Sequence, residues 1–219
     1  MRNAYQEQMR ELHEAVVRMG CLCTQAVTMA VQAVTEGDQS LAAKAVELDK
    51  EIDKLEREIE SQCLKLLLQQ QPVASDLRKI SATLKMISDL ERIGDQASDI
   101  AELSRHITGT GDWGMAHLHE MAGAAIKMVS DGVKAFLCGD LLLAKKVIQA
   151  DQVVDDWFLR IKSDLIVAIR GDNTLGEQYL DVLMVAKYLE RIGDHATNVA
   201  EWVEHSILGK RSKNGILPD

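Results

Sequence analysis

A duplicated motif constrains the fold of this chain more than any other feature of its sequence. Residues 90–95, with the sequence LERIGD, recur letter for letter at residues 189–194, which is 99 residues later. Upstream, the pair Gly37-Asp38 is matched by Gly139-Asp140 at a spacing of 102 residues. Two tandem copies of one unit explain both matches, with a three-residue deletion between the blocks in the second copy. The period is too long for a solenoid, so each copy is expected to be a small domain.

The composition is typical of long helices. Only two prolines, Pro72 and Pro218, occur among the 219 residues, and proline interrupts helices more strongly than any other residue. Aromatic residues make up 4% of the chain. The apolar content relies on Ala, Leu, Ile, Val and Met, which suits helix packing better than strands. These features exclude an all-β fold and predict an all-α protein.

Apolar periodicity predicts three helices in each copy. In the first copy we expect helices over residues 7–35, from about residue 41 to Pro72, and from about residue 74 to residue 106. Ser75 or Asp76 is the expected N-cap of the third helix. In the second copy the expected helices cover residues 115–137, 141–170 and 175–208.

The predicted architecture is a tandem duplication of an antiparallel three-helix bundle, with six helices in total. Its expected parts are a first bundle over residues 1–108, a linker over 109–114, a second bundle over 115–209 and a C-terminal tail over 210–219.

The charge balance argues against nucleic acid as a partner. The formal net charge is -9, and no basic block precedes residues 210–213. The N-terminal residues lack the apolar core of a signal peptide, and no window approaches the run of about 18 apolar residues that a membrane span needs. We therefore expect a cytoplasmic protein that is peripheral to a membrane at most. The four cysteines form no Cys-x-x-Cys pair, so we expect reduced thiols in the core.

Acidic residues form a stripe on the third expected helix. At about 100° per residue, Asp95, Asp99 and Glu102 lie about 40°, 80° and 20° from Glu91. The stripe faces away from the apolar core line, unlike the inward-facing ligands of di-iron carboxylate bundles. Crowded carboxylates repel one another, so a bound cation is expected to relieve the repulsion.

A second acidic row lies on the preceding helix and begins with Asp49 and Asp53. Asp49 lies 23 residues before Pro72, and Asp95 lies 23 residues after it. In an antiparallel hairpin the two aspartates therefore stand at one level. The second copy repeats this arrangement with Asp151 and Asp194 on either side of its own turn.

These patterns predict an oxygen-rich, multi-carboxylate cation site between the second and third helices of each copy. Gly94 and Gly193 lie where a small residue lets helices or a ligand approach closely. The alternative is a solvated helix face, because Arg92, Lys50 and Lys54 are available as ion-pair partners. Repetition of the motif at matched levels of both hairpins favours the cation site.

No catalytic motif is visible. The chain lacks a Gly-rich phosphate loop, a nucleophile elbow and a Ser/His/Asp order. None of its six histidines follows a glutamate by three residues, so the Glu-x-x-His signature of ferritin-like di-iron sites is absent. We therefore expect that the protein is not an enzyme.

The chain closely resembles the PhoU family of phosphate-transport accessory regulators. The resemblance rests on the repeated LERIGD motif, the stretch QQPVASDLR over residues 70–78 and the paired Glu/Asp-x-x-x-Asp motifs. The resemblance extends from about residue 9 to residue 208. It implies metal-binding acidic motifs, a cytoplasmic homodimer, and negative regulation of phosphate uptake and of the phosphate-starvation response. The implied partners are the ATPase subunit of the phosphate ABC transporter and a membrane sensor histidine kinase.

The resemblance also implies five metal ligands in each copy. They are Asp49, Asp53, Glu91, Asp95 and Asp99 in the first, and Asp151, Asp155, Glu190, Asp194 and Asn198 in the second. The expected cofactors are divalent or trivalent ions, with iron, zinc, manganese, magnesium and calcium as candidates. An amide replaces a carboxylate at Asn198, so the second site is expected to be the weaker one. A metal-dependent phosphatase or a metal-storage bundle is the alternative function.

Overall fold

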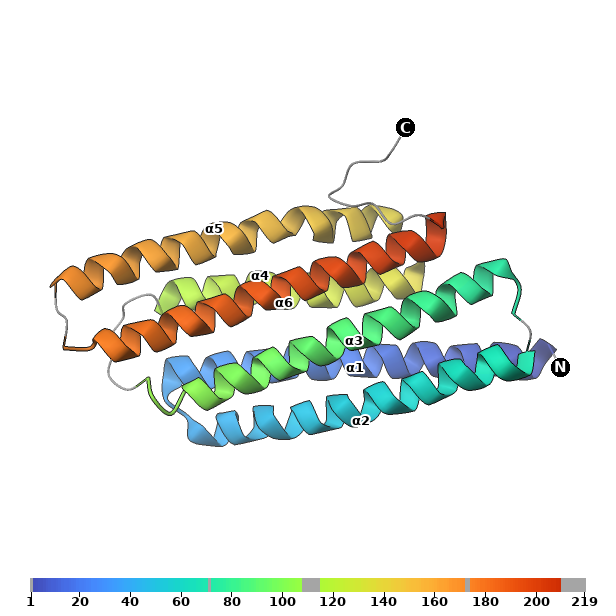
Figure 1. Cartoon of the computed structure of the whole chain (residues 1–219), viewed down its shortest axis with the longest axis horizontal. Helices are drawn as coiled ribbons and strands as arrows, with labels where there is room; N and C mark the ends of the chain where they lie inside the picture. The colour runs from blue at the N-terminus through green and yellow to red at the C-terminus, as the bar shows by residue number, and fades with distance from the viewer. Residues whose placement is uncertain (1, 71, 108–114, 172–173, 210–219) are drawn as a thin grey trace.

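The computed structural model describes residues 2–70, 72–107, 115–171 and 174–209 (Figure 1). Within these segments the chain forms six helices and no strand, which confirms the predicted all-α fold. The helices are α1 (Arg2–Glu36), α2 (Gln39–Gln70), α3 (Ala74–Leu103), α4 (Met115–Cys138), α5 (Leu141–Gly171) and α6 (Gly176–Leu208). None of them combines the length and the apolar character that a membrane crossing requires. The predicted linker and tail lie outside the described residues.

The same Gly-Asp turn joins the first two helices of each half. Gly37 and Gly139 have φ angles of 71° and 61°, in the left-handed region that glycine adopts readily at the end of a helix. The carboxylate of Asp38 accepts a hydrogen bond from the backbone N–H two residues later, at 2.8 Å. That of Asp140 accepts one from the N–H three residues later, at 3.0 Å. Each aspartate therefore caps the helix that follows the turn.

The predicted N-cap of α3 is wrong. Val73 occupies the cap position in extended backbone, with φ -69° and ψ 163°, and no side chain caps the helix there. Because the helix begins as early as Ala74, Ser75 is already inside its first turn. Asp76 lies in the first turn as well, where its negative charge interacts favourably with the positive end of the helix dipole.

The cysteines divide evenly between core and surface. Cys23 and Cys63 are buried, as expected, whereas Cys21 and Cys138 are exposed, so the expectation of core thiols is wrong for these two. Cys21 lies two residues from Cys23 and therefore faces the opposite side of α1. Cys138 is the last residue of α4.

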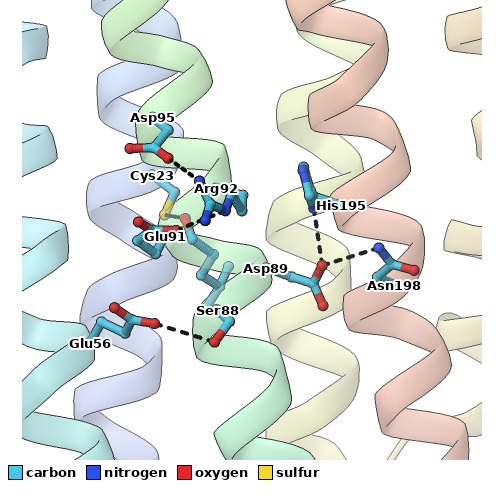
Figure 2. A network of polar contacts seen from close by, with 10 residues as sticks. Cys23, Glu56, Ser88, Asp89, Glu91, Arg92, Asp95, His195 and Asn198 are labelled. Atoms are coloured by element: carbon cyan, nitrogen blue, oxygen red, sulfur yellow. Dashed lines mark hydrogen bonds and ion pairs between the residues drawn. The ribbon is translucent and has the colours of Figure 1, made fainter.

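The two halves pack through α1 against α4 and α3 against α6, and the helices of each pair run in opposite directions (Figure 1). In the first contact, a Cβ atom at Gly20 would lie 2.6 Å from Cγ2 of Val133. In the second contact, Asp89 Oδ1 accepts a hydrogen bond from Nδ2 of Asn198 at 3.1 Å and lies 3.0 Å from Nδ1 of His195 (Figure 2). Each half thus uses its first and third helices to contact the other.

The outer faces of the α2–α3 and α5–α6 hairpins differ in chemistry. Three exposed positions are charged in the first half and apolar in the second, where Arg57, Lys65 and Lys85 are matched by Leu159, Val167 and Met184. The halves therefore share a backbone plan but differ in surface chemistry at these three positions.

Candidate metal site

Three aspartates from two helices converge in the first half. Asp49 and Asp53 on α2 and Asp95 on α3 each offer a carboxylate oxygen, and these oxygens lie within 4.8 Å of one another. All three side chains are half-buried. Among the described residues, they form the one group of three acidic, histidine or cysteine side chains that meets this distance. The common level of Asp49 and Asp95 in the hairpin is therefore confirmed.

Gly94 allows α2 to bring a carboxylate against the backbone of α3. A Cβ atom at this position would lie 2.9 Å from Oδ1 of Asp49 and 3.1 Å from Cδ1 of Ile52. Gly193 has the same place in the second half, where a Cβ atom would lie 3.3 Å from Oδ1 of Asp151. The close approach expected at both glycines is confirmed, and it is tighter in the first half.

The carboxylate of Asp49 lies in an electrostatically unfavourable environment. Its Oδ1 atom is buried and has no hydrogen-bond partner among the described residues. Burial first, and then the charges of Asp53, Asp95 and Asp99, raise the pKa of Asp49 to about 6. A buried carboxylate oxygen with no donor is unfavourable. A hard cation is the kind of group that such an oxygen fits.

Glu91 and Asp99 flank the three aspartates. Burial, and then the charge of Asp95, raises the pKa of each of these two carboxyl groups. Arg92 contacts the cluster from outside, with Nη1 at 2.8 Å from Asp95 Oδ2 and Nε at 3.4 Å from Glu91 Oε2 (Figure 2). Because the Arg92 side chain is 60% exposed, solvent screens most of its charge. The expected surface ion pair therefore exists, but it offsets the cluster only in part.

In the second half, three other implied ligands, Asp155, Asp194 and Glu190, lie close enough to Asp151 for their charges to act on it. Among the described residues, however, the oxygens of these side chains form no group within 4.8 Å of one another. Burial, and then the charges of Asp155 and Asp194, raises the pKa of Asp151 to about 6. The pKa values of Asp155 and Asp194 are also raised, by burial first and by Glu190 next. Lys187 opposes both of these shifts. We call the acidic surface between α2 and α3 the first groove and that between α5 and α6 the second groove. The second groove thus has the same arrangement of acidic residues, with a lysine beside it.

The fifth implied ligand of the second half makes a contact between the halves. The amide nitrogen of Asn198 points to Asp89 on α3 (Figure 2). The sequence reasoning missed Asp89, because no pattern within one copy shows which side chains of the other copy it meets.

The sequence reasoning also missed Lys187. Its ammonium group pairs with Glu190 and lies 5.4 Å from the centre of the Phe158 ring. The matching residue in the first half is Ser88, whose hydroxyl donates a hydrogen bond to Glu56 at 3.3 Å (Figure 2). A position-by-position comparison of the two copies would have exposed this difference.

A family model described as the PhoU domain matches the chain twice, over residues 16–104 and 118–203. Each match lies within one of the two bundles.

Two curated relatives match over nearly their whole length. One is a phosphate-specific transport system accessory protein PhoU homolog from Clostridium acetobutylicum, 34% identical over 212 residues, which cover 96% of this chain and 97% of the relative. Another protein of the same name, from Synechocystis, is 35% identical over 211 residues, or 96% of this chain and 94% of the relative.

Two crystal structures share the fold. PhoU from Pseudomonas aeruginosa has a TM-score of 0.88 and 33% identity, with 94% of this chain and 100% of that chain covered. The phosphate transport system regulatory protein PhoU from Streptococcus pneumoniae has a TM-score of 0.87 at 23% identity, with coverage of 95% and 99%.

Proposed function

Because the chain belongs to the PhoU family, we propose that it is a regulatory accessory protein of a phosphate transport system rather than an enzyme. The names of its full-length relatives support this role. The proposal has a chemical part, which concerns metal ions, and a cellular part, which concerns partners.

The chemical part of the proposal is that the acidic grooves bind metal. The observation that carries it is the convergence of Asp49, Asp53 and Asp95, with a buried Asp49 oxygen that has no donor among the described residues. These three residues, with Glu91 and Asp99 beside them, would hold a hard divalent or trivalent cation through oxygen atoms. A bound ion would neutralise the repulsion between the carboxylates and link α2 to α3. In the second half, the corresponding ligands would be Asp151, Asp155, Glu190 and Asp194, with Asn198 as an uncharged fifth.

The cellular part of the proposal is negative regulation of phosphate uptake and of the phosphate-starvation response. The protein would act in the cytoplasm as a homodimer and dock on the ATPase subunit of the phosphate transporter and on a membrane sensor histidine kinase. Family membership supports this assignment. The acidic grooves, once braced by metal, would form part of the docking surface.

The metal-binding part is tested with the double variant Asp95→Asn, Asp99→Asn. Elemental analysis of protein purified without chelator should show less bound divalent or ferric ion in the variant than in the natural protein. Far-ultraviolet circular dichroism should show nearly unchanged helicity. Loss of helicity together with metal would instead assign the acids to a structural network, and natural protein without any multivalent ion would contradict metal binding.

The regulatory part is tested in the cells that make this protein. Cells lacking the chain should take up labelled phosphate faster under phosphate-rich conditions, and the natural gene should restore normal uptake. The purified protein with added Mn²⁺ or Fe³⁺ should not hydrolyse phosphate esters. Turnover of such esters would support the alternative of a metal-dependent phosphatase.

A further inference from the structure

One pair of facing residues differs in kind between the two grooves. In the first half, Ser88 of α3 donates its hydrogen bond to Glu56 of α2 at 3.3 Å. In the second half, Lys187 of α6 and Phe158 of α5 occupy the matching positions. The second groove has therefore lost a carboxylate and gained an ammonium group at the same place, and both helices contribute to the exchange.

The ammonium group of Lys187 lies beside the acidic residues of the second groove, and its side chain is 41% exposed. It pairs with Glu190, whose side chain is 18% exposed, and its Nζ atom lies 5.4 Å from the centre of the Phe158 ring. The face of an aromatic ring attracts a cation. Lys187 also acts on Asp155 and Asp194, because its charge opposes the rise that burial and Glu190 cause in the pKa of both carboxyl groups. A single side chain thus interacts with three of the implied ligands.

The arginine of the repeated motif does not account for this difference. Arg92 in the first half has an arginine, Arg191, at the matching position in the second. Arg92 is 60% exposed, and the guanidinium of Arg191 lies 5.9 Å from the centre of the Tyr188 ring. Arg92 pairs with Glu91 and Asp95. The charge of Arg191 acts on Asp99, so both arginines act on carboxylates of the first half. The lysine at the position of Ser88 is the cation that the second half has and the first half lacks.

We propose that Lys187 is a tethered cation that takes over the charge-neutralising role of a metal ion in the second groove, so that metal binding in this chain is confined largely to the first half. The inference rests on the proposed function, in which the acidic grooves bind metal. A metal ion entering the second groove must either displace the ammonium group from Glu190 and Phe158 or bind beside a like charge. Both routes weaken binding. In the first groove, the Ser88 hydroxyl and the Glu56 carboxylate impose no such barrier. The cation beside that cluster is Arg92, whose side chain is 60% exposed, against 41% for Lys187, so solvent screens its charge more strongly.

The experiment is a reciprocal exchange of the pair in the full-length protein. The first variant, Lys187→Ser with Phe158→Glu, gives the second groove the residues of the first. The second variant, Ser88→Lys with Glu56→Phe, does the reverse. Lys187→Ser alone is the milder substitution, and Lys134→Ser, which removes an exposed lysine of α4, is the matched control for net charge. Mn²⁺ binding is measured by equilibrium titration with electron paramagnetic resonance, and anomalous scattering identifies the groove that is filled.

At limiting Mn²⁺, the natural protein and the Lys134→Ser control should fill the first groove. Lys187→Ser, with or without Phe158→Glu, should strengthen Mn²⁺ binding in the second groove by about tenfold or more, the effect expected when a like charge at close range is removed. The reverse exchange should weaken the first groove to a similar extent. Circular dichroism and the urea unfolding midpoint show whether each variant is folded.

Two other results would overturn the inference, and they can be told apart. If both grooves of the natural protein bind Mn²⁺ equally well and Lys187→Ser changes neither, the lysine does not control metal binding, although the proposed function stands. If none of the proteins binds Mn²⁺ in either groove, the proposed function fails together with the inference.

Discussion

Gly94 is a single position at which the packing of two helices and the placement of the Asp49 carboxylate depend on the same missing side chain. The Cβ atom of any other residue would meet both Asp49 Oδ1 and Ile52 Cδ1. The sequence indicated the need for a small residue here, because the glycine lies within the repeated motif. It could not indicate how close the approach is, since that depends on how α2 lies against α3.

We predict that Gly94→Ala lowers the free energy of unfolding by about 1–3 kcal/mol, the usual cost of overpacking a tight contact, and weakens metal binding by displacing the Asp49 carboxylate. Urea unfolding without metal and Mn²⁺ titration measure the two effects. Gly193→Ala, at a looser contact of 3.3 Å, should cost less. Gly123→Ala is the matched control, since nothing lies within 4 Å of its Cβ position, and should stabilise by about 0.5–1 kcal/mol. Equal effects at all three positions would contradict the packing argument.

The raised pKa values of Asp49 and Asp151 predict how the stability of the metal-free protein depends on pH. Both pKa values are raised from 3.8 to about 6 in the folded protein, so the folded state holds these two protons to higher pH than the unfolded state does. Their contribution therefore lowers stability as pH rises from about 4 to about 6, and it is constant above that range.

Urea unfolding of the chelator-treated protein between pH 4 and pH 7 measures this dependence. The double variant Asp49→Asn, Asp151→Asn should lose part of it, with a larger gain in stability at pH 7 than at pH 4. An identical pH dependence in the variant would show that these two groups do not titrate as described.

At the scale of helices, the sequence predicted most of what the structure contains. Apolar periodicity and the Gly-Asp turns locate all six helices of the described segments, because both signals are local and occur twice. The cap of α3 was predicted wrongly, since it depends on the residue at which the chain leaves its extended conformation after Pro72. The acidic cluster of the first half was predicted from the helical spacing of the acids, the hairpin register and the repeat, whereas the contacts of Asn198 and Lys187 depend on how neighbouring helices face one another.

The contact between α1 and α4 provides a test at this scale. We predict that Gly20→Ala lowers the free energy of unfolding by about 1–3 kcal/mol, because the added methyl group would lie 2.6 Å from Cγ2 of Val133. The branched side chain of valine has little rotamer freedom in a helix and cannot move aside easily. Replacing Val133 with alanine in the Gly20→Ala background should recover part of the loss. Urea unfolding of the two variants measures both effects, and a neutral Gly20→Ala would show that the helices separate easily.

At the scale of the whole molecule, the halves are joined by two helix pairs and by the contacts of Asp89 with α6. We therefore predict that the two halves unfold together. Two of the three tryptophans, Trp157 and Trp202, lie in the second half, so their fluorescence reports mainly on that half, whereas circular dichroism reports on every helix. The two urea unfolding curves should coincide. A fluorescence transition that precedes the loss of helicity would show that the second half unfolds independently.

The antiparallel pairing of α1 with α4 and of α3 with α6 brings each helix against its own counterpart in the other half. Two identical molecules related by a two-fold axis make contacts of this kind. The chain therefore has the internal organisation of a two-fold dimer within one polypeptide. In a dimer of identical chains every substitution appears on both sides of the axis at once. A single chain is free of this constraint, so that a lysine occupies one acidic groove while a serine occupies the other.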